Sequence, residues 1–107
     1  MAVINLELNN IPEAFQTKLR LMIVSALCTG EKTFKELKNI TGATDGNLSI
    51  QISKLEELEY LTVTKEFVGK KTKTTCRISE TGYQNFSEYV KMLNNILLHA
   101  EEKEIII

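Results

Sequence analysis

The sequence has little of the material from which metal centres, disulfide frameworks and histidine-based active sites are built. It contains two cysteines, Cys28 and Cys76, and one histidine, His99. Cysteines this few and this far apart suit neither a disulfide framework nor a Cys-x-x-Cys metal site, so we interpret them as buried structural thiols rather than a redox switch. A lone histidine supplies no catalytic pair and no metal cluster. We therefore expect no catalytic residues, no metal site and no cofactor.

Long apolar runs are missing as well. Nothing approaches the roughly 18 consecutive apolar residues of a membrane span, and MAVINLELNN lacks the charged-then-apolar order of a signal peptide. No glycine-rich phosphate loop follows a strand, and no internal repeat or low-complexity linker divides the 107 residues. These absences predict a single domain over residues 1–107 of a soluble, cytoplasmic protein that is not an enzyme and has no membrane partner.

What is present is an ordinary globular composition with an uneven distribution of charge. The chain is 43% hydrophobic and 25% charged, with a formal net charge of −1, which taken whole argues neither for nor against a nucleic-acid partner. Residues 44–60 hold four acidic side chains and one basic one, whereas residues 61–79 hold five basic and one acidic. The positive charge is therefore concentrated in one short segment.

The segment 44–61, TDGNLSIQISKLEELEYL, predicts an amphipathic helix. At 3.6 residues per turn, Leu48, Ile52 and Leu55 share one narrow sector with Leu58 close by, and this sector is the expected core face. The opposite face carries small or hydrogen-bonding residues around one isoleucine, namely Gly46, Asn47, Ser49, Ile50, Ser53 and Lys54. Such a face suits contact with a partner, although a scattered exposed isoleucine is also common.

A shorter helix is expected just before it. Thr33 and Glu36 make a capping box for a helix over residues 34–40. Its inner face is predicted to be Phe34, Leu37 and Ile40, and its outer face to carry Lys35 and Lys38. These two lysines would meet either phosphates or solvent. Gly42 permits a left-handed turn, after which Thr44 can cap the next helix at Asn47.

Two strand patterns rich in β-branched residues follow. Residues 61–68 alternate Leu61, Val63 and Phe67 with polar residues, and residues 72–78 place Cys76 and Ile78 on one side. Between them, VGKK supplies a hairpin tip with a glycine available for positive φ. Together these segments predict helix, tight turn, helix and hairpin.

The two ends of the chain leave alternatives open. Asn10 can cap a helix that runs to Thr29-Gly30, or Thr17 can start a second helix after a brief break. The opening MAVINLELNN is either a short strand or the lead-in to a helix. The Ile105–Ile107 tail belongs either to dimer packing or to a loose end.

Ser79 can cap a last long helix with a wide apolar stripe. Its residues recur at spacings of four and three: Phe86, Val90, Leu93, Leu97 and Ala100. The same helix of a second copy would bury such a stripe most simply, which predicts a two-fold homodimer with these five residues at its interface. The alternative is that the helix folds back on the first helix of its own chain.

In order and spacing, RLMIVSAL, TFKELKNITGATDGNLSIQISKLEELEYL and KEFVGKKTKTTCRISETG resemble the bacterial and archaeal winged-helix transcriptional regulators related to the MarR and ArsR groups. The resemblance covers roughly residues 17–98 and is greatest to the small single-domain type with a T-D-G-N-L-S recognition helix. It implies a mainly α fold with a small antiparallel β-hairpin, a winged helix-turn-helix with an added C-terminal dimerisation helix. The helix-turn-helix would span about 33–59, the wing about 61–79 and the last helix about 80–100. Glu59 departs from the pattern, because relatives usually have glycine there.

The resemblance further implies a homodimeric, sequence-specific regulator that binds double-stranded DNA, with its recognition helix in the major groove and its basic wing on the backbone or minor groove. The DNA-contact residues that it implies are Thr44, Asp45, Asn47, Ser49, Ile50, Gln51 and Lys54, with Lys35, Lys38, Lys70, Lys71 and Lys73. Amide side chains suit adenine edges, and an isoleucine suits a thymine methyl group. Because the recognition segment is itself acidic, we expect it to contribute discrimination more than affinity.

Two other functions compete with DNA binding. A winged helix can serve as a protein–protein interaction module without sequence-specific DNA binding, since fold alone does not determine function. The third hypothesis is an enzyme, and the sequence contains no set of catalytic residues that supports it. A small-molecule effector of unknown identity could act in the crevice between the dimer helices and the DNA-binding core.

Overall fold

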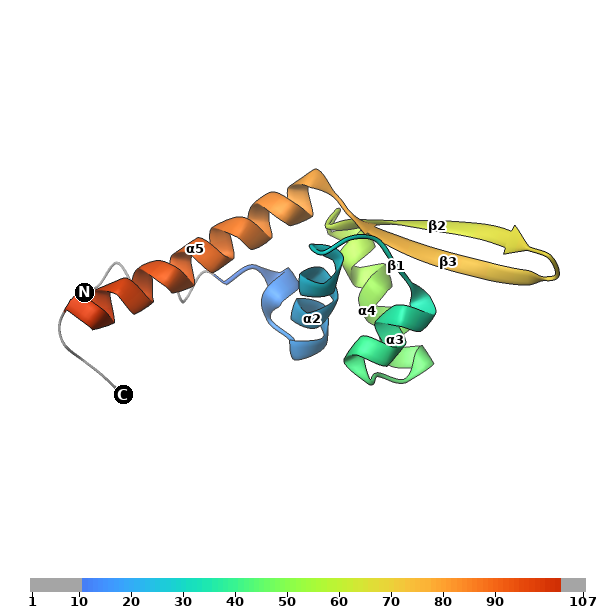
Figure 1. The fold of residues 1–107 in the computed structure, drawn as a ribbon, viewed down its shortest axis with the longest axis horizontal. Helices are drawn as coiled ribbons and strands as arrows, with labels where there is room; N and C mark the ends of the chain where they lie inside the picture. The colour runs from blue at the N-terminus through green and yellow to red at the C-terminus, as the bar shows by residue number, and fades with distance from the viewer. Residues whose placement is uncertain (1–10, 103–107) are drawn as a thin grey trace.

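The computed structural model describes residues 11–102. Its elements, in chain order, are η1 (Glu13–Phe15), α2 (Lys18–Leu27), β1 (Lys32–Thr33), α3 (Phe34–Thr41), α4 (Asp45–Glu57), β2 (Leu61–Val68), β3 (Lys71–Ile78) and α5 (Glu80–Glu102). In Figure 1 the helices α2, α3 and α4 form a body, from which the β2–β3 hairpin projects to one side and α5 to the other. The predicted winged-helix fold, mainly α with a small antiparallel sheet, is confirmed.

At the N-terminal side, the chain forms two separate helical segments instead of one helix running to Thr29-Gly30. η1 is a single 3-10 turn, and α2 begins after Thr17, whose hydroxyl accepts a hydrogen bond from the backbone N–H of Arg20 at 3.3 Å. The alternative in which Thr17 starts a separate helix is therefore the correct one. Asn10, the opening MAVINLELNN and the Ile105–Ile107 tail lie outside the described residues.

The helix-turn-helix is bounded by the capping residues that the sequence indicates. The backbone N–H of Thr33 donates to the Glu36 carboxylate at 2.9 Å, and the N–H of Glu36 donates to the Thr33 hydroxyl at 3.1 Å. Gly42, with φ of 70°, ends α3 in the left-handed conformation. The Thr44 hydroxyl then accepts from the N–H of Asn47 at 3.2 Å. Both helix starts are thus confirmed.

The sheet has three antiparallel strands in the order β1-β3-β2. Lys32 pairs with Cys76 and Thr33 with Thr75, so β1 extends the predicted hairpin by one short strand. Val68 pairs with Lys71, which leaves Gly69 and Lys70 as a two-residue loop. Gly69 has φ of 67°, a conformation that favours glycine.

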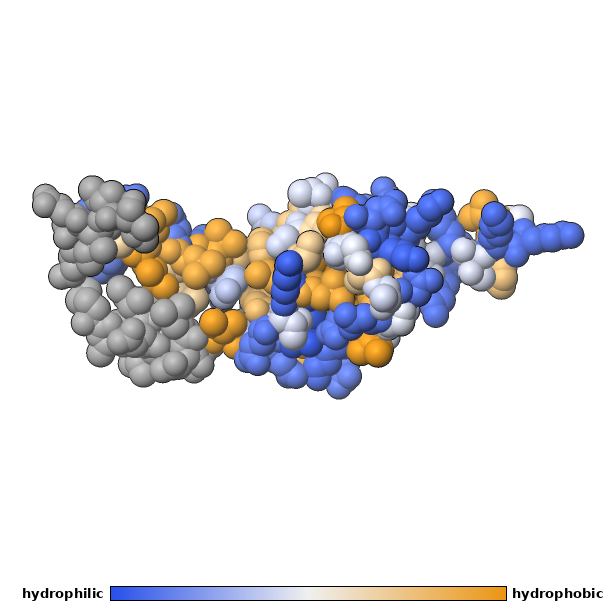
Figure 2. Space-filling model, turned by 90° about the horizontal axis from the view of Figure 1, so that it is seen from below, coloured by the Kyte–Doolittle hydropathy of each residue, from blue (hydrophilic) through white to orange (hydrophobic). Residues whose placement is uncertain are grey.

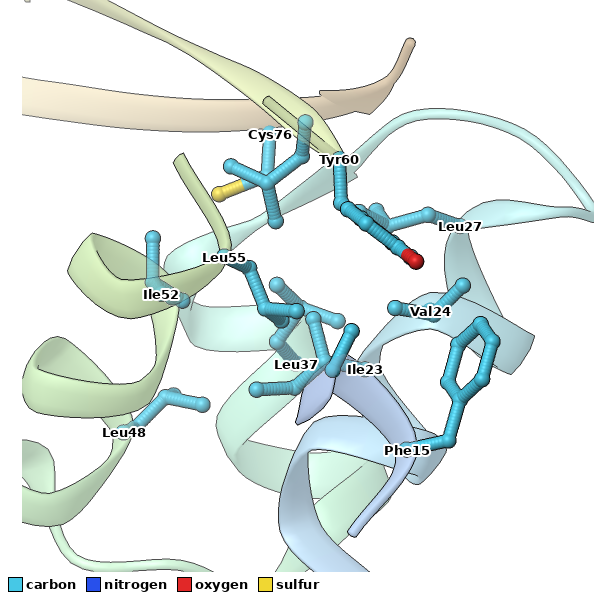
Figure 3. Close-up of a cluster of buried hydrophobic side chains, with 12 residues drawn as sticks. Phe15, Ile23, Val24, Leu27, Leu37, Leu48, Ile52, Leu55, Tyr60 and Cys76 are labelled. Atoms are coloured by element: carbon cyan, nitrogen blue, oxygen red, sulfur yellow. The ribbon is translucent and has the colours of Figure 1, made fainter. Parts of the chain in front are cut away.

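The core lies where the three helices meet the base of the sheet (Figure 3). The predicted core face of α4 is confirmed, because Leu48 and Leu55 are 0% exposed and Ile52 is 5% exposed. The other buried side chains come from η1, α2, α3, the β2–β3 pair and the residue just before β2: Ala14, Phe15, Ile23, Val24, Leu27, Leu37, Tyr60, Leu61 and Cys76.

Two positions predicted to face the interior are instead exposed. Ile40 is 47% exposed in the last turn of α3, beside Leu21 and Met22, whereas Leu37, one turn earlier on the same face, is 0% exposed. Phe67 is 81% exposed. It is on the same face of the sheet as the buried Leu61, but the hairpin has extended past the helical body by then (Figure 1). Alternation predicts the face of a strand and not what covers it.

A tight junction connects α4, β2 and α5. Helix α4 ends at Glu57, earlier than the segment 44–61 suggested, and Glu59 follows with φ of 64°. The residue that replaces the usual glycine thus keeps a glycine-like backbone. The Ser79 hydroxyl donates to the Glu59 carbonyl at 2.6 Å and accepts from the N–H of Gly82 at 2.9 Å, which confirms Ser79 as the cap of α5.

Helix α5 divides into a packed half and a projecting half. Phe86 and Tyr89 pack on Phe15 of η1, with ring centroids 5.8 Å and 4.9 Å from it. Beyond them the helix leaves the body, and Val90, Leu93, Leu97 and Leu98 are 42–55% exposed. The radius of gyration of 16.6 Å exceeds the approximately 13 Å of a compact domain of this length. The alternative, in which the last helix folds back on its own chain, therefore applies only to the first turns of α5.

Candidate nucleic-acid interface

The surface of α4 that faces away from the core presents short polar side chains around one isoleucine. Asn47, Ser49 and Ser53 are exposed, and Ile50 is 65% exposed. They form this surface because Leu48, Ile52 and Leu55 hold the opposite side of the helix in the core. Hydroxyl and amide groups next to an apolar side chain can bond to base edges and pack on a thymine methyl group.

Two other predicted contact residues of α4, Gln51 and Lys54, point toward α2 and η1. The Gln51 side-chain oxygen accepts a hydrogen bond from the Arg20 guanidinium at 2.9 Å, and its amide nitrogen donates to the Asn47 side-chain oxygen at 3.4 Å. The Lys54 ammonium lies 3.0 Å from the Glu13 carboxylate. Both side chains are thus engaged within the chain. Sequence periodicity could not reveal this, because Arg20 and Glu13 are more than 30 residues away along the chain.

Lys38 and Asp45, also predicted contacts, form an ion pair with each other. Their nitrogen and oxygen atoms are 2.7 Å apart, and the pair joins the last turn of α3 to the first turn of α4. Side-chain exposures of 47% and 70% make this a solvent-screened pair of small net stability. Its main consequence is electrostatic, because Asp45 offsets the charge that Lys38 would present to a phosphate. Lys35 is exposed on the outer face of α3.

The wing carries the predicted lysines on a projecting arm. Lys70 lies in the two-residue loop, and Lys71 and Lys73 are exposed on β3. The structure adds Lys65 on β2 to these lysines. Sequence reasoning missed it, although strand alternation places Lys65 on the same face as Val63 and Phe67. Lys65 lies opposite Thr74 on the helical side of the sheet, whereas Lys73 lies opposite Glu66 on the other side.

A groove of about 410 Å³ separates α4 from the helical side of the sheet. The groove is lined from α4 by two serines and two carboxylates, and from the strands by one lysine among uncharged residues: Ser49, Ser53, Asp45, Glu56, Val63, Lys65 and Thr74. The polar face of α4 and the base of the wing therefore border one continuous surface. Figure 2 shows hydrophobic residues along α5, in the middle of the body and near the end of the hairpin, with hydrophilic residues around them and at the extreme end of the hairpin.

Both thiols lie in surroundings that disfavour the charged thiolate form. Burial, with a smaller contribution from Glu56, raises the pKa of Cys76 to about 11, and Cys76 is 0% exposed. Burial also raises the pKa of Cys28, which is half-buried. Cys76 is thus a buried thiol as predicted, and Cys28 only partly so. Among residues 11–102, no group of three acidic, cysteine or histidine side chains could hold a metal ion.

Residues 11–102 also include no helix that is long and apolar enough to cross a membrane. The expectations of no catalytic residue, no cofactor and no enzymatic activity remain predictions from the sequence.

Comparison with known proteins places this geometry in a family. The family described as the winged helix DNA-binding domain matches residues 19–97, nearly the span of the resemblance read from the sequence. No curated protein matches the chain.

Several solved structures share the fold. A transcriptional regulator homologue from Pyrococcus horikoshii has a TM-score of 0.78 at 19% identity, over 89% of this chain and 94% of that one. A MarR-family regulator from Enterococcus faecalis has a TM-score of 0.73 at 20% identity, over 98% and 92%. A homodimeric winged helix-turn-helix DNA-binding domain from Mycobacterium bovis, a possible ArsR-family regulator, has a TM-score of 0.71 at 19% identity, over 92% and 88%. Identities this low establish the fold alone.

Proposed function

This chain belongs to the family of winged helix DNA-binding domains, and we propose that it is a homodimeric, sequence-specific transcriptional regulator. The observation that carries the proposal is the polar outer face of α4 next to a lysine-rich hairpin across one groove. The first suits base edges in the major groove, and the second suits phosphates.

In this proposal the side chains of α4 divide by their intramolecular bonds. Asn47, Ser49 and Ile50 are exposed and contact bases directly. The side-chain oxygen of Gln51 accepts a hydrogen bond from Arg20, so Gln51 presents its amide N–H to a base. It does not bond to an adenine with its oxygen and its N–H together. Lys54 acts near the phosphate backbone from its pair with Glu13. Asp45 lies at the start of α4 in its pair with Lys38, where a base with a hydrogen-bond donor suits its carboxylate better than a phosphate does.

The backbone contacts come from lysines and from the helix start. Lys70, Lys71 and Lys73 of the wing meet phosphates or the minor groove, and Lys35 and Lys38 of α3 meet phosphates. Thr44 lies at the N-terminus of α4, where the helix dipole favours a phosphate. Lys38 reaches a phosphate fully only when that phosphate displaces Asp45, so part of its attraction is lost to the internal pair.

The test of DNA binding begins with selection of bound duplexes from a random pool by the purified protein. Affinity for the selected duplex should fall steeply with salt, and Lys70→Glu combined with Lys71→Glu should lower the slope of log K against log salt by about two. Lys91→Glu on α5, a charge reversal away from the wing, is the control and should leave the slope unchanged.

Two outcomes would contradict this. If the pool yields no duplex with salt-sensitive binding, the DNA-binding proposal fails. If the double lysine variant keeps the full biological activity, the protein–protein interaction module is the better description.

The dimer is proposed from the projecting half of α5. Val90, Leu93 and Leu97 form an exposed apolar stripe that water does not favour, and a second copy would bury it. Of the five interface residues expected from the sequence, Phe86 is already packed on Phe15, so it would lie at the inner edge of the interface. Ala100 is half-buried near the far end of the helix.

Sedimentation equilibrium of matched variants tests the dimer. Leu93→Glu places a charge in the stripe and should yield monomers, whereas Asn95→Glu places the same charge on the opposite side of α5 and should leave dimers. Equal masses for the two variants would contradict the proposed interface. A selected DNA site without two-fold symmetry would do so independently.

A further inference from the structure

The tip of the wing exposes apolar surface that the proposed phosphate contacts do not use. Phe67 is 81% exposed, the highest value among the exposed large hydrophobic side chains that the structure describes, and its neighbour Val68 is 60% exposed. Burying such a ring would be favourable. This pair lies at the end of β2, just before the Gly69-Lys70 loop.

Strand alternation determines which way the two side chains face. Phe67 pairs with Thr72 and is on the same face as Leu61 and Val63, which is the helical side of the sheet. Val68 pairs with Lys71 and faces away. On the helical side, Val63 and Lys65 border the groove whose other wall is Ser49 and Ser53 of α4. Phe67 thus faces the side on which DNA read by α4 would lie.

Charge around the tip favours an anionic partner. Residues 65–73 contain four lysines and one glutamate, and all four lysines are exposed. An aromatic side chain surrounded by lysines fits a groove whose walls are phosphates and whose floor is stacked bases. A protein partner would need apolar surface or carboxylates at the same place, and the adjacent α4 face supplies no reason for one.

The reach of the hairpin is also suitable. Phe67 is four positions beyond Val63, which lies at the base of the hairpin. An antiparallel strand rises about 3.4 Å per residue, so the ring lies roughly 14 Å farther out. The centre of a major groove and the adjacent minor groove are about half a helical turn apart, roughly 17 Å. A helix in one groove and the hairpin tip in the next are compatible with these lengths.

We propose that Phe67 is an apolar wedge that enters the minor groove beside the site read by α4 and partly unstacks one base step. This rests on the proposed function and adds a specificity determinant to it. Apolar wedges kink the duplex, and flexible pyrimidine–purine steps kink most easily. Sequences selected by the protein should therefore contain TA or CA steps at the wing position.

The experiment compares Phe67→Ala with Val68→Ala on the duplex selected by the wild-type dimer. Phe67→Ala should weaken binding by about tenfold, as expected for loss of aromatic contact with bases. It should leave the salt slope unchanged, because no charge is removed. It should also abolish the bend seen by energy transfer between end labels, and the fluorescence rise of 2-aminopurine at the wing step. Val68→Ala should behave like wild type, and Phe67→Leu should retain part of the bend.

Circular dichroism and sedimentation of the same variants verify that fold and dimer are unchanged, as expected for a side chain this exposed. Equal affinity, bend and fluorescence for Phe67→Ala and wild type would overturn the wedge and leave the proposed function standing. A shift of Phe67→Ala to monomers, or loss of binding to anionic phospholipid vesicles without any effect on DNA, would also overturn it. Absence of DNA binding by the wild-type protein would instead remove the function on which the wedge rests.

Discussion

The helical body and the two projections that leave it differ in where their apolar side chains lie. In the body, Leu37, Leu48 and Leu55 are 0% exposed. At the tip of the hairpin Phe67 is 81% exposed, and on the outer half of α5 Leu93 is 42% exposed. The body completes its own core, whereas the projections present apolar surface that stays exposed among residues 11–102. Substitutions of the buried side chains in the body should therefore change folding, and substitutions of the exposed apolar side chains in the projections should change association.

The largest effect is expected from truncation in the body. Leu55→Ala removes a fully buried side chain at the centre of α4 and should lower the free energy of unfolding by about 2–5 kcal/mol, from lost burial and the cavity left behind. Urea denaturation at fixed protein concentration measures it. Phe67→Ala is the comparison and should stay within about 0.5 kcal/mol of wild type. Similar losses in the free energy of unfolding for both variants would contradict the conclusion that the body holds the core and the hairpin tip does not.

The junction between body and α5 should be nearly as sensitive. Gly82 is buried, and a Cβ atom there would lie 2.2 Å from the backbone carbonyl oxygen of Tyr60. Gly82→Ala should therefore destabilise the protein by about 1–3 kcal/mol, because a backbone atom cannot move aside cheaply.

Gly46→Ala is the matched control for the junction, since a Cβ at Gly46 meets no atom within 4 Å. That change should be neutral or stabilise α4 by up to about 1 kcal/mol. Thermal unfolding of the two variants provides the comparison. A Gly82→Ala protein as stable as wild type would mean that α5 is not held as closely as the structure indicates.

Gln51 lies at the boundary between the two kinds of region. Gln51→Ala removes the acceptor of a hydrogen bond from a charged group, Arg20, and should cost about 1.5 kcal/mol of stability. It should also weaken preference among DNA sequences more than it weakens binding overall. Denaturation and a panel of duplexes measure the two effects. Ser53→Ala, at an exposed position, is the stability control, and a uniform loss of affinity across the panel would contradict a role in discrimination.

The smallest effect concerns the cap of α3. Hydrogen bonds from the backbone N–H and then the side chain of Thr33 lower the pKa of the Glu36 carboxyl group. A lowered pKa in the folded state stabilises the fold above the pKa of the unfolded chain, about 4.3, and the contribution is lost as the pH falls through the folded-state pKa. The stability of wild type relative to Glu36→Gln should therefore decrease between pH 6 and pH 3. A constant difference would show that the carboxylate does not contribute.

Most of the fold could be predicted from the sequence because its signals are local. The apolar sector of α4 depends on residues three and four apart, and the caps Thr33, Thr44 and Ser79 bond within three residues. Gly42 and Gly69 mark turns that require positive φ. Such patterns determine which face is apolar and where a helix starts. The winged-helix order and its resemblance to the MarR and ArsR groups followed from them, and both are confirmed.

The sequence by itself thus determined the two helices of the helix-turn-helix, the hairpin, the last helix, the inner face of α4 and the basic wing. Only the tertiary structure decided which of the candidate contact residues are free. Arg20 holds Gln51, Glu13 holds Lys54, and Asp45 holds Lys38, and two of these pairs join residues more than 30 positions apart. The exposure of Phe67 was likewise decided by where the helical body ends. Periodicity describes one element at a time, whereas bonds between elements depend on how those elements pack.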